Sequence, residues 1–152
     1  MVTDGSGVLS FAAVGASAGQ VIQVLGATDS TARTTTSTSF VTGSNTLSVT
    51  ITPSNASSKF AIFVGHYAYN TASTTFYTIF RDSTNLGGSA GIAVFGSASG
   101  TADSQVFYSH LDSPNTTSPI TYQAYMKASA ATTGYMNSAN STSQIIVMEI
   151  KG

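Results

Sequence analysis

Two neighbouring segments of the chain alternate their side chains with a period of two residues. In 45–53, Leu47, Val49 and Ile51 alternate with threonine and serine. In 59–69, both sets of alternate positions are largely apolar. Successive side chains of a β-strand point to opposite faces, so this period predicts strands. Because both faces of 59–69 are apolar, we expect a central strand or a strand at an interface.

Further segments rich in β-branched and aromatic residues extend the pattern. These predicted strands are 8–11, 20–25, 33–41, 75–81, 92–95, 105–111, 121–127, 134–137 and 144–150. Turn-forming residues separate them, as in 82–85 and 112–115. No window keeps a period of 3.6 residues. The sequence therefore predicts an all-β fold, an antiparallel β-sandwich or jelly roll.

The length of 152 residues suits one domain. Small side chains dominate residues 1–18, which we interpret as an N-terminal extended arm. Residues 19–152 are predicted to form a single β-sandwich (jelly-roll) domain. The glycines of 87–100 predict either a mobile loop or a strand that another backbone approaches closely.

Charged residues are scarce: 7% of the chain, against about 25% in a typical soluble domain. With a net charge of -1 there is no basic stripe for nucleic acid and no polybasic segment for a membrane, so neither partner is expected. The chain has no cysteine, which excludes disulfides. No stretch approaches the roughly 18 apolar residues of a membrane span, and 1–25 lacks the features of a signal peptide. We expect a soluble chain without membrane insertion.

Catalytic motifs are missing from the sequence. His66 and His110 lie in no recognisable motif, and no Gly-x-Ser-x-Gly elbow is present. The acidic residues are isolated at turns and strand ends, and a calcium ion at Asp82 and Asn85 is less favoured than an ordinary Asx turn there. We therefore expect no enzyme activity, no metal and no cofactor.

Aromatic residues fall on both alternation faces of the middle strands, and one sheet face cannot bury them all. The second set is expected to form an oligomer interface or, as an alternative, a surface on which sugars stack. From their strand positions we predict an interface that contains Tyr67, Tyr69, Phe107 and Tyr125.

Six segments resemble one protein family. They are GQVIQVL at 19–25, LSVTITPSNASSKFAIFV at 47–64, FRDSTNL at 80–86, LDSP at 111–114, ITYQAYMK at 120–127 and IIVMEI at 145–150. Together they resemble the β-sandwich modules on the virion surface of tailed bacteriophages. These modules are capsid cement or decoration proteins and the head domains of tail fibres, commonly trimers with a jelly-roll body.

The resemblance implies a structural virion protein: a homotrimer on the capsid exterior that binds the major capsid protein and stabilises the capsid. The alternative is a tail-fibre or receptor-binding head that recognises a host-surface polysaccharide. The sequence carries no coiled-coil heptads, collagen repeat or β-helix shaft, which favours cement. Residues 4–11 resemble the short strand that precedes many fibre heads, which keeps the alternative open.

Overall fold

The computed structural model describes residues 2–3, 9–10, 15–130, 132–138 and 141–152, and within these ranges it contains strands and turns but no helix. The strands are β1 (Val2–Thr3), β2 (Leu9–Ser10), β3 (Val21–Asp29), β4 (Arg33–Thr35), β5 (Val41–Thr42), β6 (Ser48–Ile51), β7 (Lys59–Thr71), β8 (Thr74–Arg81), β9 (Thr84–Asn85), β10 (Ala93–Gly96), β11 (Thr101–Asp112), β12 (Ile120–Ala128), β13 (Gly134–Met136) and β14 (Ser143–Ile150).

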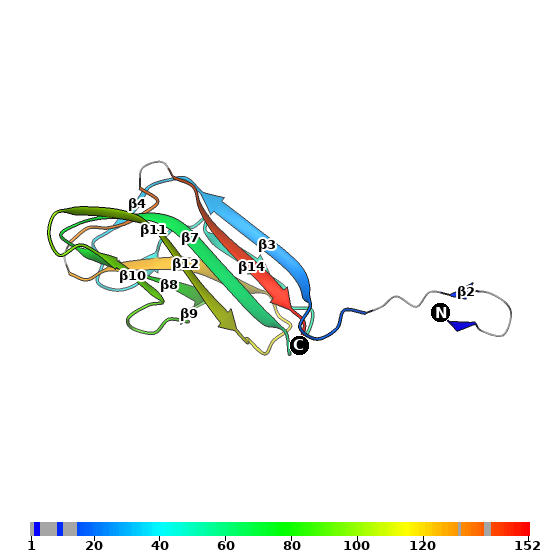
Figure 1. Ribbon diagram of the computed structural model, residues 1–152. Helices are drawn as coiled ribbons and strands as arrows, with labels where there is room; N and C mark the ends of the chain where they lie inside the picture. The colour runs from blue at the N-terminus through cyan, green and yellow to red at the C-terminus, as the bar shows by residue number, and fades with distance from the viewer. Residues whose placement is uncertain (1, 4–8, 11–14, 131, 139–140) are drawn as a thin grey trace.

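One antiparallel sheet has the strand order β11-β7-β14-β3, and its four strands lie side by side in Figure 1. The register fixes which residues are neighbours across it. Tyr108 lies opposite Val64, which lies opposite Ile145. We call this the front sheet.

A second antiparallel sheet lies behind the first and has β8 and β12 at its centre (Figure 1). Strand β10 pairs with the outer edge of β8, and β6 and β5 both pair with the other edge of β12. The two-residue turn at Asp82 and Ser83 leads from β8 back to β9. A short β4–β13 ribbon packs against β7 and β12.

The core lies between these two sheets. In β7 the even-numbered side chains Phe60, Ile62 and Val64 are buried, and they pack in one cluster with Tyr77 and Ile79 of β8. Each such side chain contributes about 1.5–3 kcal/mol on burial. The prediction of an antiparallel β-sandwich is thus confirmed, and the jelly-roll topology stays a prediction.

The prediction of one continuous strand over 33–41 is wrong, because this segment forms two strands, β4 and β5. They pair with different partners, β13 and β12. Between them the Ser37 hydroxyl donates a hydrogen bond to the Ser39 carbonyl at 2.7 Å and so closes a local turn. Hydroxyl side chains that bond the nearby backbone favour turns over continuous strands.

The glycine-rich segment 87–100 contains strand β10 and one close backbone approach. Gly91 has a φ of +73°, and a Cβ atom at this position would lie 2.5 Å from the Tyr77 carbonyl oxygen. Only glycine combines this backbone angle with so close a neighbour.

Most of the predicted arm 1–18 lies outside the described residues. The domain's first residues are tied to its last ones. The Gly19 amide donates to the Lys151 carbonyl at 2.7 Å, and the Lys151 amide donates to the Gln20 carbonyl at 2.9 Å. These bonds fix the entry into β3 beside the end of β14.

Candidate functional site

The outward side of the front sheet is the most unusual surface of the described residues. It exposes Phe107 by 71%, Leu111 by 58%, Val24 by 54% and Phe63 by 45%. On an ordinary sandwich the solvent side of a sheet is polar. We call this surface the outer face.

The strand register arranges the outer face in rows that cross the sheet. One row runs Leu111, Ala61, Met148 and Val24 from β11 to β3. The next row runs Ser109, Phe63, Ile146 and Gly26, and the third runs Phe107, Gly65, Gln144 and Thr28. The first two rows contain one polar side chain among eight residues. Apolar surface therefore extends across all four strands.

A shallow hollow of about 190 Å³ lies at the centre of the outer face. Its walls include Phe63, Phe107 and Ile146. The hollow exists because Gly65 has no side chain, and the ring of Phe107, its cross-strand partner, lies over it. A Cβ atom at Gly65 would lie 2.6 Å from Phe107 Cε1. The glycine and the phenylalanine thus form one unit that sets the relief of this surface.

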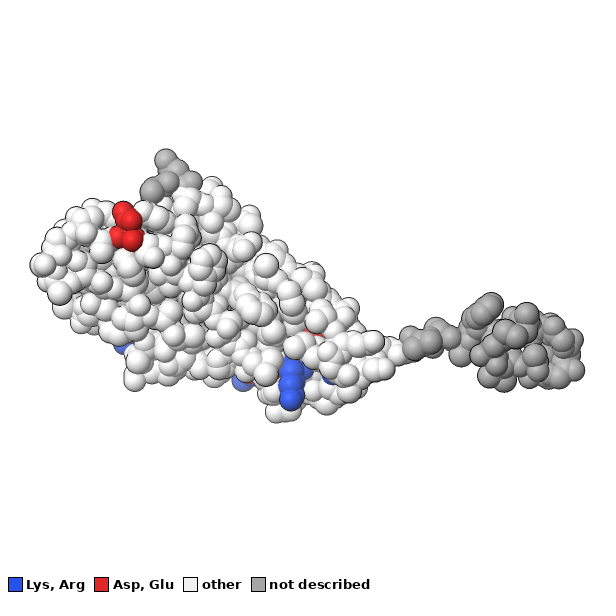
Figure 2. All heavy atoms as spheres, viewed as in Figure 1, with Lys and Arg blue, Asp and Glu red and all other residues white. Residues whose placement is uncertain are grey.

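Charge is confined to the two ends of the outer face. Among its described residues, Lys59 at the start of β7 and Asp103 near the start of β11 carry the charges. On the face turned to the viewer in Figure 2, the largest acidic group lies at the upper left of the sandwich and the largest basic group at its lower right, with a mostly uncharged surface between them. Depletion of charge around exposed aromatic side chains is characteristic of interface cores.

The structure brings three of the four predicted interface residues to this surface. Tyr67 and Tyr69 lie on the outward side of β7, in the rows beyond Gly65, and Phe107 lies on β11. Tyr125 lies elsewhere. It is on the outward side of β12 in the second sheet, stacked on Phe80 with ring centroids 4.0 Å apart.

Sequence reasoning missed Phe63, Leu111, Ile146 and Val24 as part of this surface. A signal was present for two of them, since 59–69 and 144–150 are apolar on both alternation faces. For Val24 and Leu111 no such signal exists, because their exposure follows from which strands stand at the edges of the sheet.

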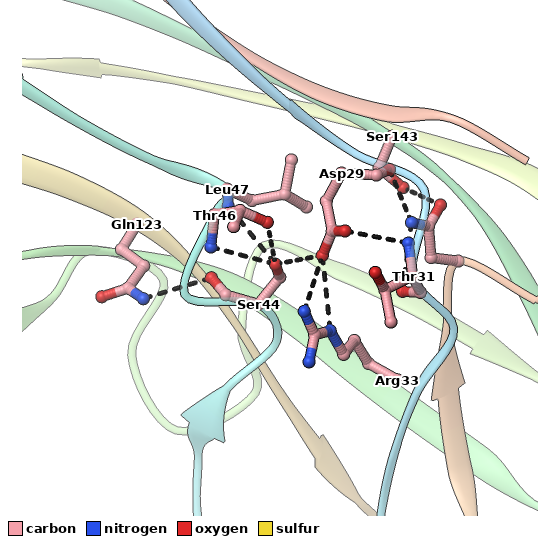
Figure 3. A network of polar contacts seen from close by, with 9 residues as sticks. Asp29, Thr31, Arg33, Ser44, Thr46, Leu47, Gln123 and Ser143 are labelled. Atoms are coloured by element: carbon pink, nitrogen blue, oxygen red, sulfur yellow. Dashed lines mark hydrogen bonds and ion pairs between the residues drawn. The ribbon is translucent and has the colours of Figure 1, made fainter.

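The polar cluster around Asp29 is saturated by its own neighbours (Figure 3). The Ser44 hydroxyl donates to Oδ2 of Asp29, as do Nε and Nη2 of Arg33. The Thr31 amide donates to Oδ1 at 2.8 Å. Burial opposes the charge of Asp29, but the hydrogen bonds from Ser44 and Thr31 outweigh it and hold the pKa of this carboxyl well below its usual range. The cluster binds the end of β3 to the loop before β6, and both oxygens of Asp29 already accept hydrogen bonds from the chain.

Two other buried carboxylates are also held by internal partners. Nη1 of Arg81 donates to both oxygens of Asp112 at 2.8 Å, and the Tyr122 hydroxyl donates to Oδ2 of Asp112 at 2.7 Å. Burial opposes the charge of Glu149, but the amide and hydroxyl of Ser54, each 2.7 Å away, lower the pKa of Glu149. These groups join strands and are not arranged around a cleft.

The two histidines lie in different surroundings. His66 is fully buried, its ring 4.3 Å from that of Tyr77 and 5.9 Å from that of Tyr108. Neither of its ring nitrogens has a hydrogen-bond partner, and burial lowers the pKa of His66 to about 4. His110 is half-buried on β11. His66 therefore acts as a neutral core side chain.

Among the described residues, no three His, Cys, Asp or Glu side chains converge in a way that could hold a metal ion. In the same part of the chain no helix has the length and apolar character needed to cross a membrane. A scan against protein-family models and a search of curated proteins both find no match to this chain.

Proposed function

We propose that this chain is a structural protein of a bacteriophage virion surface, a cement or decoration protein that works by association through the outer face. The observation that carries the proposal is the apolar, nearly uncharged surface across all four strands of the front sheet. Contiguous exposed apolar patches of this kind mark interaction sites.

The low charge of the chain supports the same role. A free protein depends on net charge to stay dispersed, whereas a protein held on a particle does not. The assignment to a virion, the capsid exterior as the location and the major capsid protein as partner come from the resemblance of the sequence. The trimer that this resemblance implies stays a prediction.

The experiment is cryo-electron microscopy of the phage particle that carries this chain. Density of the sandwich at regular positions on the capsid supports the cement role, and particles made without the chain are then expected to break at lower temperature. Density absent from the whole particle would overturn the virion assignment.

A receptor-binding head is the second candidate, and one observation favours it. At the end of the outer face beyond Gly65, the ring of Tyr69 stands nearly perpendicular to that of Tyr135, with centroids 5.1 Å apart, and half-exposed Tyr67 lies beside them. The flat faces of tyrosine rings suit the stacking of sugars. Density at fibre tips, with binding on a glycan array that Tyr67→Ala abolishes, would move the assignment to this role.

A further inference from the structure

We propose that a second copy of this chain covers the outer face. The two copies pack face to face around a two-fold axis that passes through the hollow at Gly65. This inference rests on the proposed function and deepens it by naming the partner of its interaction surface. The two-fold pair stands in place of the trimer that the sequence resemblance implies.

The distribution of exposed apolar side chains favours a two-fold pair. Six of the nine large apolar side chains that are exposed lie on the outer face: Val21, Ile22, Val24, Phe63, Phe107 and Leu111. A two-fold contact uses the same patch on both copies, whereas a closed ring of three needs two different patches on each copy. The described residues present one such patch.

The area of the outer face is sufficient. Strands of 8 to 13 residues form it. With about 3.3 Å per residue and about 4.8 Å between strands, the four strands cover roughly 700 Å² per copy. Two copies would then bury roughly 1,400 Å², inside the range of about 1,200–2,000 Å² for stable complexes. Two sheets also pack naturally at about 10 Å, as in the core of a sandwich.

The charges fix the direction of packing. Lys59 and Asp103 lie at opposite ends of the outer face, and Asp103 is opposite Tyr69 in the register. When the strands of the second copy run antiparallel to those of the first, Lys59 of each copy faces the Tyr69 and Asp103 end of the other. A parallel arrangement would instead place Lys59 against Lys59.

The centre of this arrangement coincides with the hollow. The position midway between Lys59 and Tyr69 along β7 is Val64, which lines the hollow. A two-fold axis at Val64 sets Phe107 of each copy opposite Ser109 of the other, at the edge of the hollow. The strongly exposed ring of Phe107 thus meets the hollow of the other copy.

The first test measures the mass of the full chain in solution by analytical ultracentrifugation. We expect about 31 kDa, twice the 15.5 kDa of the chain. Phe107→Ser should weaken the pair at least about 100-fold, because large aromatic side chains at an interface centre dominate affinity. The matched control is Val94→Ser, which truncates a side chain of 55% exposure on β10 of the other sheet and should leave the mass unchanged.

A second test reads the direction of packing without altering the chain. A carbodiimide joins a lysine to a carboxylate only when the two groups touch. Lys59 and Asp103 are separated by ten residues of β7, roughly 33 Å along the sheet, so a bond between them must join two copies. We expect this cross-link in the 31 kDa species. Lys59→Glu should weaken the pair about tenfold, and the double variant Lys59→Glu, Asp103→Lys should restore it.

Several results would overturn the inference. A monomer at high micromolar concentration, or a mass of about 46 kDa, excludes the two-fold pair. A pair that persists in Phe107→Ser uses another surface, and a pair whose cross-links omit Lys59 to Asp103 has another direction of packing. These readouts are independent of where the chain sits on a particle, so the pair and the virion role can fail separately.

Discussion

At the scale of single residues, His66 links the core to solution pH. Its pKa is about 4 in the folded chain and 6.5 as an unperturbed side chain, because its ring is buried between tyrosines. Between these two pH values the unfolded chain binds the proton more readily than the folded one. The free energy of unfolding should therefore fall as the pH falls from 6.5 to 4, by up to about 3 kcal/mol.

Urea unfolding at pH 7, 5 and 4 measures this dependence. His66→Leu removes the titrating ring, so its stability should change less with pH in this window. His110→Leu, which replaces a half-buried histidine on the neighbouring strand, is the matched variant for the loss of a histidine side chain. If His66→Leu retained the full slope, the pH dependence would belong to other groups.

Asn137 is a second residue whose role depends on its backbone. It has a φ of +65° and is buried, and its side-chain amide donates to the Asp29 carbonyl at 2.6 Å while its oxygen accepts from the Ser143 hydroxyl. Asn137→Ala loses these bonds and keeps the strained backbone angle. We expect a loss of about 3 kcal/mol in the free energy of unfolding.

Asn137→Gly is the matched variant, because it loses the same side-chain bonds but accepts a positive φ at no steric cost. Thermal and urea unfolding should show it more stable than Asn137→Ala by about 1 kcal/mol. Equal stability of the two variants would mean that the backbone angle carries no strain.

At the scale of elements, the β7–β11 pair shows how one missing side chain shapes a surface. Gly65→Ala places a Cβ atom 2.6 Å from the Phe107 ring as it now lies. The ring is exposed and can swing away, so the stability of the fold should fall by less than about 1 kcal/mol. Self-association should weaken about tenfold because the hollow closes. Sedimentation together with urea unfolding separates the two effects. Unchanged association would show that the hollow is not used.

Strands were predictable where alternation alone defines them. The buried set of 45–53 and both faces of 59–69 follow from local sequence, since a strand's period is independent of its partners. The division of 33–41 into β4 and β5 was not predictable, because each part pairs with a strand far away in the sequence. Strand β4 pairs with β13, and β5 pairs with β12. Alternation also does not say which sheet a strand joins, and this is why Tyr125 was grouped with Tyr67 and Phe107.

At the scale of the whole molecule, the sandwich has a core between its sheets and a second apolar layer on the outer face of one sheet. The core was predictable from periodicity, and the apolar layer on the outer face only in part. The extent of this outer layer depends on the order β11-β7-β14-β3, which sets four apolar strands side by side. Long-range pairing of this kind is not encoded in any one segment.

Heat capacity tests the second apolar layer as a whole. A pair that buries roughly 1,400 Å², mostly apolar, should associate with a heat-capacity change on the order of -0.2 kcal/mol/K, since apolar burial lowers heat capacity by about 0.45 cal/mol/K per Å² and polar burial raises it by about 0.26. Calorimetric dilution of the natural chain at several temperatures measures this slope. Because charge enters only through Lys59 and Asp103 at the two ends of the outer face, moderate salt should weaken association by less than about tenfold. A slope near zero with strong salt dependence would mean that charged groups, not this apolar layer, hold the copies together.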